Sequence, residues 1–196
     1  MITKLYLPLQ NLLDKTRVAD GIAPLALRLY LAPIMIQAGY NKWVGFDGTA
    51  EWFAYLGFPI PVVLTFLAMA TELVGGVLLL VGLATRWISL PLMFTMLIAA
   101  LTVHGENGWL AIADSSSWLA NQNVLAAQEK LAMAKNILQE YGNYDWLTSS
   151  GSFVILNNGV EFAATYFIML LVLFFNGGGR YVSVDYWLNR HFSASK

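Results

Sequence analysis

Residues 60–103 decide the fold, and they read IPVVLTFLAMATELVGGVLLLVGLATRWISLPLMFTMLIAALTV. Two apolar runs, 60–83 and 87–103, are separated only by Ala84, Thr85 and Arg86. A helix that crosses a membrane needs about 20 apolar residues, because each residue adds about 1.5 Å along the helix axis. The turn between the runs is too short for anything but an antiparallel arrangement. This stretch therefore predicts a hairpin of two membrane spans.

The composition of the whole chain agrees with a lipid environment. Of its 196 residues, 58% have apolar side chains and 12% are charged, and that charged share is about half of what a soluble domain carries. The formal net charge of -1 leaves no basic block for a nucleic-acid partner. The chain has no cysteine, which excludes disulfides, thiolate metal sites and iron–sulfur clusters. Any electron transfer would need a bound cofactor or a quinone.

Two further apolar runs, 22–40 and 159–175, complete the predicted architecture. We expect an all-α fold: a bundle of four transmembrane helices with an external amphipathic helical insertion between spans three and four. The predicted single membrane domain covers residues 1–196. It has an amphipathic lead-in at 1–21 that is not a cleavable signal, an insertion at 105–158 and a tail at 176–196. Short loops are expected between spans one and two and between spans two and three.

The insertion contains a predicted amphipathic helix of about six turns, which we expect to begin at the serines 115–117 and to end near Gly142. Its apolar stripe must pack against another surface to be shielded from water. One interpretation is a lid on the bundle mouth or on the membrane surface, and the other is a docking helix for a partner. The residues of this stripe recur at steps of three and four: Val124, Ala127, Leu131, Ala134, Leu138 and Tyr141.

The orientation follows from the basic residues near the span ends, because cytoplasmic loops carry an excess of lysine and arginine. Seven basic residues on one side of the membrane against three on the other predict that both termini are cytoplasmic and that the insertion is periplasmic, in a bacterial inner membrane. The seven are Lys4, Lys15, Arg17, Arg86, Arg180, Arg190 and Lys196, and the three are Lys42, Lys130 and Lys135.

Ionisable side chains inside a bilayer are costly, so each one is a functional hypothesis with a partner to be found. Arg28 in span one and Glu72 in span two are candidates for an intramembrane ion pair. The alternatives are that Arg28 snorkels to the cytoplasmic surface and that Glu72 is protonated and hydrogen-bonded. Gly75 and Gly76 share the face of Glu72, where a helix or a flat ligand could approach the backbone closely.

A second candidate site lies at the outer ends of the spans, where Lys42, His104 and Glu161 are expected at similar depth. His104 is a candidate proton carrier or metal ligand oriented by Glu161, or an interfacial histidine bonded to water or to a loop carbonyl. Met93 and Met96 lie near the face of His104, so they are candidate Cu(I) ligands or ordinary packing residues.

Several motifs carry a family resemblance. They are the arginine of span one with Gly39-x-x-Lys42 at its end, Glu72-x-x-Gly75-Gly76, the turn from Gly82 to Arg86, His104, and the Gly-Gly-Arg-Tyr-x-Ser-x-Asp ending at 178–185. On these residues the chain resembles the DoxX family of membrane proteins. The resemblance implies a four-helix bundle with both termini inside, and a link to thiosulfate oxidation with quinone as acceptor or to complexes with redox-stress enzymes. The long insertion departs from the compact family pattern and resembles a branch associated with the maturation of copper-binding modified peptides (RiPPs).

Two functions fit these observations. The first is an inner-membrane accessory protein that supports a redox or copper-peptide maturation system by binding a periplasmic protein or modified peptide through its insertion. The alternative is a quinone-interacting subunit of a membrane oxidoreductase of the thiosulfate:quinone type. The residues do not decide whether the chain is itself an enzyme, since they form no complete catalytic constellation, and they identify no cofactor beyond quinone or copper as candidates.

Overall fold

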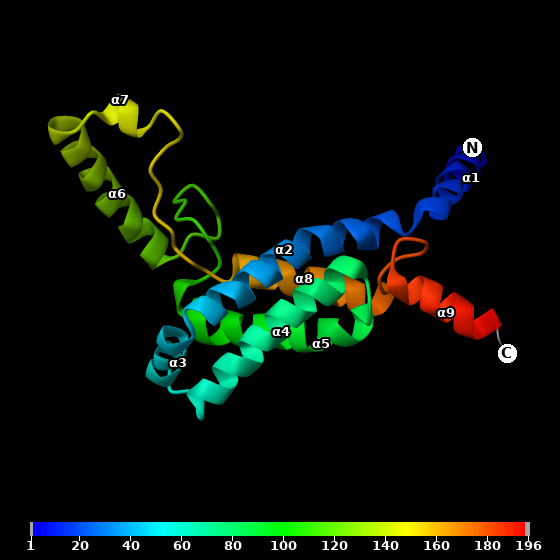
Figure 1. Ribbon diagram of the computed structural model, residues 1–196. Coiled ribbons are helices and arrows are strands. Elements are labelled where there is room, and N and C mark those ends of the chain that lie inside the picture. Colours follow the sequence, from blue (N-terminus) through cyan, green and yellow to red (C-terminus); the bar gives the residue numbers. More distant parts are fainter. Residues whose placement is uncertain (1, 195–196) are drawn as a thin grey trace. The chain divides into compact units, whose positions relative to one another are not determined.

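The computed structural model describes residues 2–194, and within them the fold is helical, as predicted (Figure 1). No strand forms in this part of the chain, where a single bridge joins Ile112 and Leu156. The chain divides into two compact units. The first runs up to Thr95 and resumes at Tyr166, and the second is Met96–Thr165. Lys196 lies outside the described residues, and so does the side chain of Lys4.

The four expected spans correspond to the four most apolar helices, which are α2 (Ile22–Val44), α4 (Pro61–Val81), α5 (Thr85–Ala99) and α8 (Glu161–Asn176). Three described segments have the length and composition to cross a membrane, namely 22–44, 61–81 and 85–107, the last being α5 with the turns that follow it. The fourth, α8, is apolar but has only 16 residues. The protein is thus a multi-pass membrane protein.

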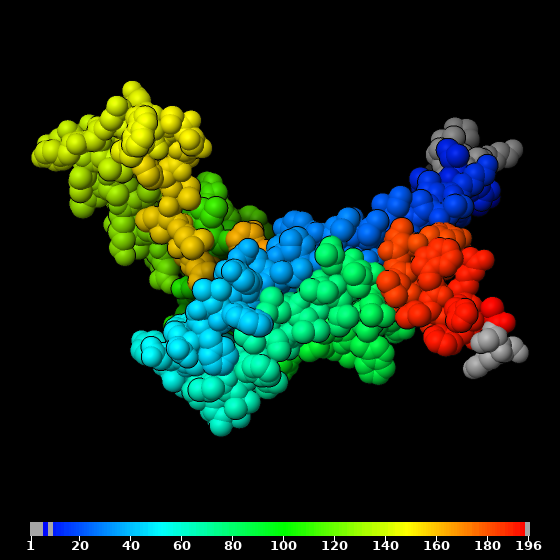
Figure 2. Space-filling model, viewed as in Figure 1, coloured from blue at the N-terminus to red at the C-terminus, as the bar shows by residue number. Residues whose placement is uncertain are grey.

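Glycines set how α2 and α4 pack against each other, and Figure 2 shows these two helices side by side without a gap. A Cβ atom on Gly39 would lie 2.7 Å from the backbone nitrogen of Leu73, and one on Gly76 would lie 2.9 Å from that of Ile36. Such contacts are too short for any side chain, so only glycine permits this approach. The glycines therefore fix the antiparallel register, with Gly39 level with Leu73 and Ile36 level with Gly76.

The connection between spans one and two is not the short loop expected from the sequence. A ten-residue helix, α3 (Phe46–Tyr55), fills it and packs against α4. The lead-in forms α1 (Ile2–Lys15), followed by a 3-10 turn (Thr16–Ala19), and the tail forms α9 (Val184–Ala194). A helix in this tail was not predicted, although Trp187, Leu188 and Phe192 recur in it at helical spacing.

The second unit contains the insertion. Span three ends in a π turn (Ala100–His104) and a 3-10 turn (Gly105–Asn107). The backbone of 108–113 then pairs with that of 155–161, through bonds such as Ala113 N to Ile155 O at 2.9 Å and Glu161 N to Trp109 O at 3.0 Å. These bonds hold the two ends of the insertion together. Between them lie α6 (Gln122–Tyr141) and the short α7 (Tyr144–Leu147).

The insertion helix was predicted, but its start was placed too early. The first serines instead belong to turns: Ser116 donates its hydroxyl and its backbone N–H to the carboxylate of Asp114, which lowers the pKa of that carboxyl. Helix α6 begins only at Gln122, because Asn121 accepts the backbone N–H of Val124 as its N-cap. The predicted stripe is buried only at Val124 and Ala127, which pack on Ala113.

Candidate functional site

Arg28 is almost completely buried, with 1% of its surface exposed, and it bonds only to backbone carbonyls. Its Nε donates to Leu79 O at 2.6 Å and its Nη2 to Leu80 O at 2.9 Å. Its Nη1 donates to Gly178 O at 2.6 Å and to Val182 O at 3.2 Å. The last carbonyls of a helix lack partners within the helix. The guanidinium therefore caps the C-terminus of α4 and ties it to the loop that follows α8.

Glycine again makes this arrangement possible. Gly82 ends α4 with φ +70°, a left-handed conformation that favours glycine. A Cβ atom at this position would lie 2.5 Å from the guanidinium carbon of Arg28. The glycine of the Gly82–Arg86 turn thus provides the room that the buried arginine occupies.

The expected ion pair between Arg28 and Glu72 does not form. The register explains why, because it places Arg28 opposite the C-terminal end of α4. There its side chain bonds to Leu79 O and Leu80 O, about two helical turns from Glu72. The alternative that Arg28 snorkels to the surface is also wrong, since its side chain is buried among the carbonyls.

Glu72 instead pairs with Lys42, whose Nζ donates to Glu72 Oε2 at 2.7 Å. The side chain of Glu72 is 5% exposed and that of Lys42 is 24% exposed, so this is a largely buried ion pair. It follows from the glycine contacts, because Lys42 lies one turn beyond Gly39, which packs on Leu73. Gly75 faces a neighbouring helix, one of the two alternatives expected for it, since a Cβ atom there would meet Leu92 of α5 at 3.0 Å.

Of the expected outer-end group, Lys42 belongs to the first compact unit and is bonded to Glu72, whereas His104 and Glu161 belong to the second. His104 Nδ1 lies 2.9 Å from Asn158 O, the loop-carbonyl contact that was one of the two interpretations of this histidine. Glu161 accepts the backbone N–H of Ala111 at 2.9 Å through its Oε2. Both side chains thus contact the paired backbone at the base of the insertion.

Nothing in the described part of the chain groups three or more His, Cys, Asp or Glu side chains in a way that could hold a metal ion. Met93 and Met96, the other candidate copper ligands, are buried at 8% and 9% exposure. Their burial fits the packing interpretation of these two methionines.

Asp185 and Arg180 hold structural positions that were not predicted from the sequence. Asp185 accepts the backbone N–H groups of Ala84 and Thr85, at 2.6 and 2.8 Å, and so caps the start of α5. Ala84 adopts φ +52°, a strained conformation that these bonds help to hold. The sequence feature that could have indicated the role of Asp185 is its position as the acidic residue that ends the 178–185 motif. Arg180 Nη1 lies 3.6 Å from the carboxylate of Asp20.

In chemical terms, three charged side chains of this region are bonded within the chain, whereas the buried hydroxyls of Thr65 and Thr85 have no hydrogen-bond partner. Arg28 caps a helix, Glu72 neutralises Lys42, and Asp185 caps another helix. These contacts tie the spans and helix ends of the first compact unit to one another.

A comparison with known sequences agrees with the motifs. The sequence model of the DoxX family matches residues 23–105, so the match ends where the insertion begins. "Inner membrane protein YphA" of Escherichia coli is 32% identical over 97 residues, which are 50% of this chain and 68% of that protein.

Two further relatives are similar over shorter shares of their length. "Putative oxidoreductase CatD" of Bacillus subtilis is 35% identical over 82 residues, 42% of this chain and 60% of that protein. A protein of Haemophilus influenzae is 31% identical over 100 residues, 47% of this chain and 64% of that protein. The chain thus spans less than two thirds of these two relatives. No solved structure shows significant similarity to the chain.

Proposed function

Because the chain belongs to the DoxX family, we propose that it is an accessory membrane protein of a redox system, and that its insertion binds a partner protein outside the bilayer. The contact surface is a second row of apolar residues on α6, which shares only Tyr141 with the stripe predicted from the sequence. We call this row, Met133, Ile137 and Tyr141, the α6 stripe. The four spans act as the anchor that holds this surface at the membrane.

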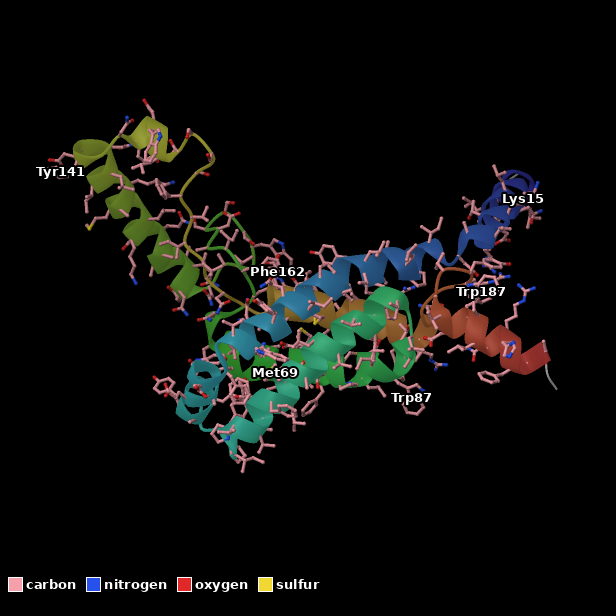
Figure 3. All side chains as sticks on the ribbon, in the orientation of Figure 1. Lys15, Met69, Trp87, Tyr141, Phe162 and Trp187 are labelled. Carbon is pink, nitrogen blue, oxygen red and sulfur yellow. The ribbon has the colours of Figure 1, made fainter. Side chains whose placement is uncertain are left out.

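The exposed α6 stripe is the observation that carries this proposal. Its three residues follow one another at intervals of four and so lie along one side of the helix. They are 67%, 54% and 80% exposed, and Figure 3 places Tyr141 at the end of α6. Exposed apolar residues that line one face of a helix are typical of a docking surface.

The charges of the insertion favour a protein over a lipid surface as the occupant of the stripe. Helices that lie on membranes carry lysine and arginine on their polar face. Residues 105–158 carry five acidic residues against two lysines. An anionic bilayer would repel such a segment, whereas an apolar groove on a protein would not.

The family match supports placing the specific function in the insertion. The matched residues, 23–105, include Arg28, Lys42 and Glu72, and these side chains are bonded within the chain. The insertion lies beyond the match. The redox context rests on the name of the Bacillus subtilis relative. A copper-binding modified peptide is a partner that the same experiment tests.

Site-directed photocrosslinking tests the proposal. A photoreactive residue at Ile137 should capture a defined partner in cells, whereas one at Gln139 should not, because Gln139 is exposed on another side of α6. The substitution Tyr141→Asp should abolish the capture at Ile137 without lowering the amount of protein. Equal products from Ile137 and Gln139, or capture that survives Tyr141→Asp, would contradict a specific surface.

A quinone-interacting oxidoreductase subunit is the second candidate, and the name of the Bacillus subtilis relative favours it. The candidate intramembrane residues Arg28 and Glu72 do not favour it, because both are bonded within the chain. Extraction of the purified protein with organic solvent tests this function. A stoichiometric quinone would support it, and unchanged quinol oxidation by membranes that lack the protein would contradict it.

A further inference from the structure

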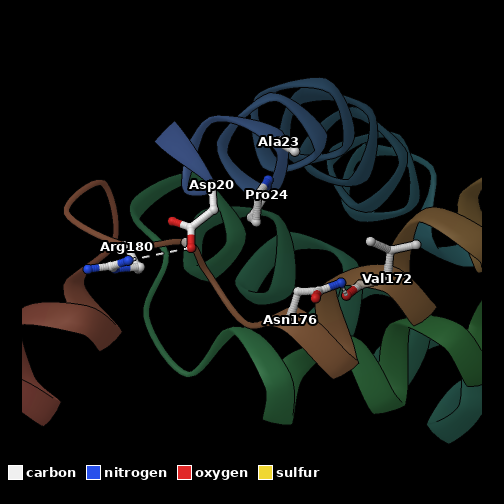
Figure 4. A pocket seen from close by; sticks show the side chains of 7 residues that line it. Asp20, Ala23, Pro24, Val172, Asn176 and Arg180 are labelled. Atoms are coloured by element: carbon white, nitrogen blue, oxygen red, sulfur yellow. Dashed lines mark hydrogen bonds and ion pairs between the residues drawn. The ribbon is translucent and has the colours of Figure 1, made fainter. Parts of the chain in front are cut away.

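Two adjoining hollows share Asn176, Gly179 and Arg180, and we call them together the Arg180 cavity. The larger has a volume of about 480 Å³ and is lined by residues that include Arg86, Trp87, Tyr186 and Asn189. The smaller, of about 260 Å³, is lined by Asp20, Pro24 and Val172 among others (Figure 4). All these residues belong to the first compact unit. The cavity lies where α5 begins and α8 ends.

Two guanidinium groups line the larger hollow. Arg86 is held by its Nε, which donates to Phe174 O at 2.8 Å, and its guanidinium carbon lies 5.8 Å from the centre of the Phe174 ring. Arg180 is half exposed, and its Nη2 donates to the hydroxyl of Tyr181 at 3.1 Å. Tyr181, and after it Asp20, raise the pKa of Arg180, so this group keeps its charge.

The acidic groups beside these arginines are Asp185 and Asp20. Both oxygens of Asp185 accept backbone N–H groups at the start of α5, so its charge is already compensated. Asp20 lies 3.6 Å from Arg180, beyond hydrogen-bond distance and on the surface. A second anion can therefore compete for Arg180. The backbone of Gly177 and Gly179, at φ +73° and +96°, leaves that wall of the cavity free of side chains.

The surroundings of the cavity are those of a membrane interface. Trp87 and Phe175, which line it, are 78% and 68% exposed, and Trp87 projects outward from the start of α5 (Figure 3). Exposed aromatic residues at the ends of apolar helices lie among lipid headgroups. A soluble anion would gain no binding energy from these apolar side chains, whereas a lipid contacts them with its glycerol and acyl chains.

We propose that the Arg180 cavity binds the phosphate of an anionic phospholipid, with Arg86 and Arg180 contacting the phosphate oxygens and Trp87 and Phe175 lying beside the acyl chains. Arginine pairs with phosphate through two parallel hydrogen bonds, which lysine cannot form. Basic pockets at the cytoplasmic ends of transmembrane helices bind such headgroups. The lipid thereby fixes the depth of this end of the bundle.

Native mass spectrometry of the full-length protein with phosphatidylglycerol and with phosphatidylcholine of the same acyl chains tests the proposal. The wild type should retain phosphatidylglycerol in preference to phosphatidylcholine. Arg86→Gln and Arg180→Gln should each weaken this binding roughly fivefold. Arg190→Gln is the matched control, because it removes the same charge from α9, where Arg190 lies over the Trp187 ring and does not line the cavity. Arg180→Lys should restore only part of the binding.

Equal retention of the two lipids, or equal losses in Arg180→Gln and Arg190→Gln, would overturn the proposal. If Arg86→Gln proves unstable, Arg180→Gln alone tests the proposal. The Arg180 side chain is half exposed and contacts surface groups, so its replacement should leave the protein folded. A parallel measurement of the melting temperature with inorganic phosphate distinguishes a lipid headgroup from a soluble phosphate as the source of the anion. If phosphate raises the melting temperature in a manner that depends on Arg180, and phosphatidylglycerol adds nothing, the ligand is a soluble phosphate and the lipid assignment is wrong.

Discussion

Replacing Arg28 by methionine should destabilise the protein strongly, because it removes every bond that ties the end of α4 to the loop after α8 through this side chain. Hydrogen bonds from a charged donor contribute about 1.5–3 kcal/mol each. Arg28 makes two such bonds at 2.6 Å, to Leu79 O and Gly178 O, and two longer ones. The short bonds alone predict a loss of about 3–6 kcal/mol. The longer bonds add less than their full value, because neighbouring interactions are not additive.

Reversible unfolding in mixed detergent micelles, followed by circular dichroism, measures this loss as a shift in the midpoint. Arg17→Met is the matched control, because the Arg17 side chain is 80% exposed and pairs with Asp14, three residues earlier on the surface, which predicts a change below about 1 kcal/mol. Arg28→Lys should fall between the two, since an ammonium group keeps the charge but cannot reach carbonyls in two directions. Equal midpoints for Arg28→Met and Arg17→Met would refute the capping role.

The remaining contacts and the expected orientation lead to three more predictions. Lys42→Met leaves the buried Glu72 carboxylate alone and should cost about 3–5 kcal/mol, whereas Lys42→Met with Glu72→Gln should cost less in the same unfolding assay; strictly additive losses would exclude the pair. Asp185→Asn removes charge from the cap of α5 and should lower stability by about 1–2 kcal/mol, and an unchanged midpoint would contradict that role. Because the chain has no cysteine, a single cysteine at Gln139 should react with a membrane-impermeant maleimide in spheroplasts, and one at Ser193 only after permeabilisation; the reverse pattern would invert the expected orientation.

The spans were predictable because a bilayer imposes a simple rule on a long apolar run. The ends of the predicted runs differ from the helices by a few residues, as at Val44, where polar Asn41 and Lys42 continue a helix that the hydropathy ends earlier. Helix α3 was missed because its length is well below that of a span. The start of α6 was misplaced because an Asp114 turn and an Asn121 cap look alike in a sequence rich in serine and asparagine.

The candidate residues of the spans were identified, but their partners were not. Hydropathy orders residues by depth, whereas pairing depends on the register between helices. Gly39 and Gly76 set that register, because a Cβ atom on either would lie only 2.7 or 2.9 Å from a backbone nitrogen of the facing helix. This close approach is not visible in a single sequence. Arg28 was assigned an acidic partner because charge pairing is the common solution. Its actual partners are backbone carbonyls, which every residue carries and no motif marks.

If the membrane bundle is a scaffold and the α6 stripe binds the partner, the set of proteins that copurify with the chain depends on that stripe. Quantitative mass spectrometry of proteins that copurify with the wild type, with Ile137→Asp and with Gln139→Asp measures this dependence. We expect a protein that the wild type and Gln139→Asp retain equally and that Ile137→Asp loses, although all three proteins are equally abundant and stable. Identical sets of copurifying proteins for the three would contradict it.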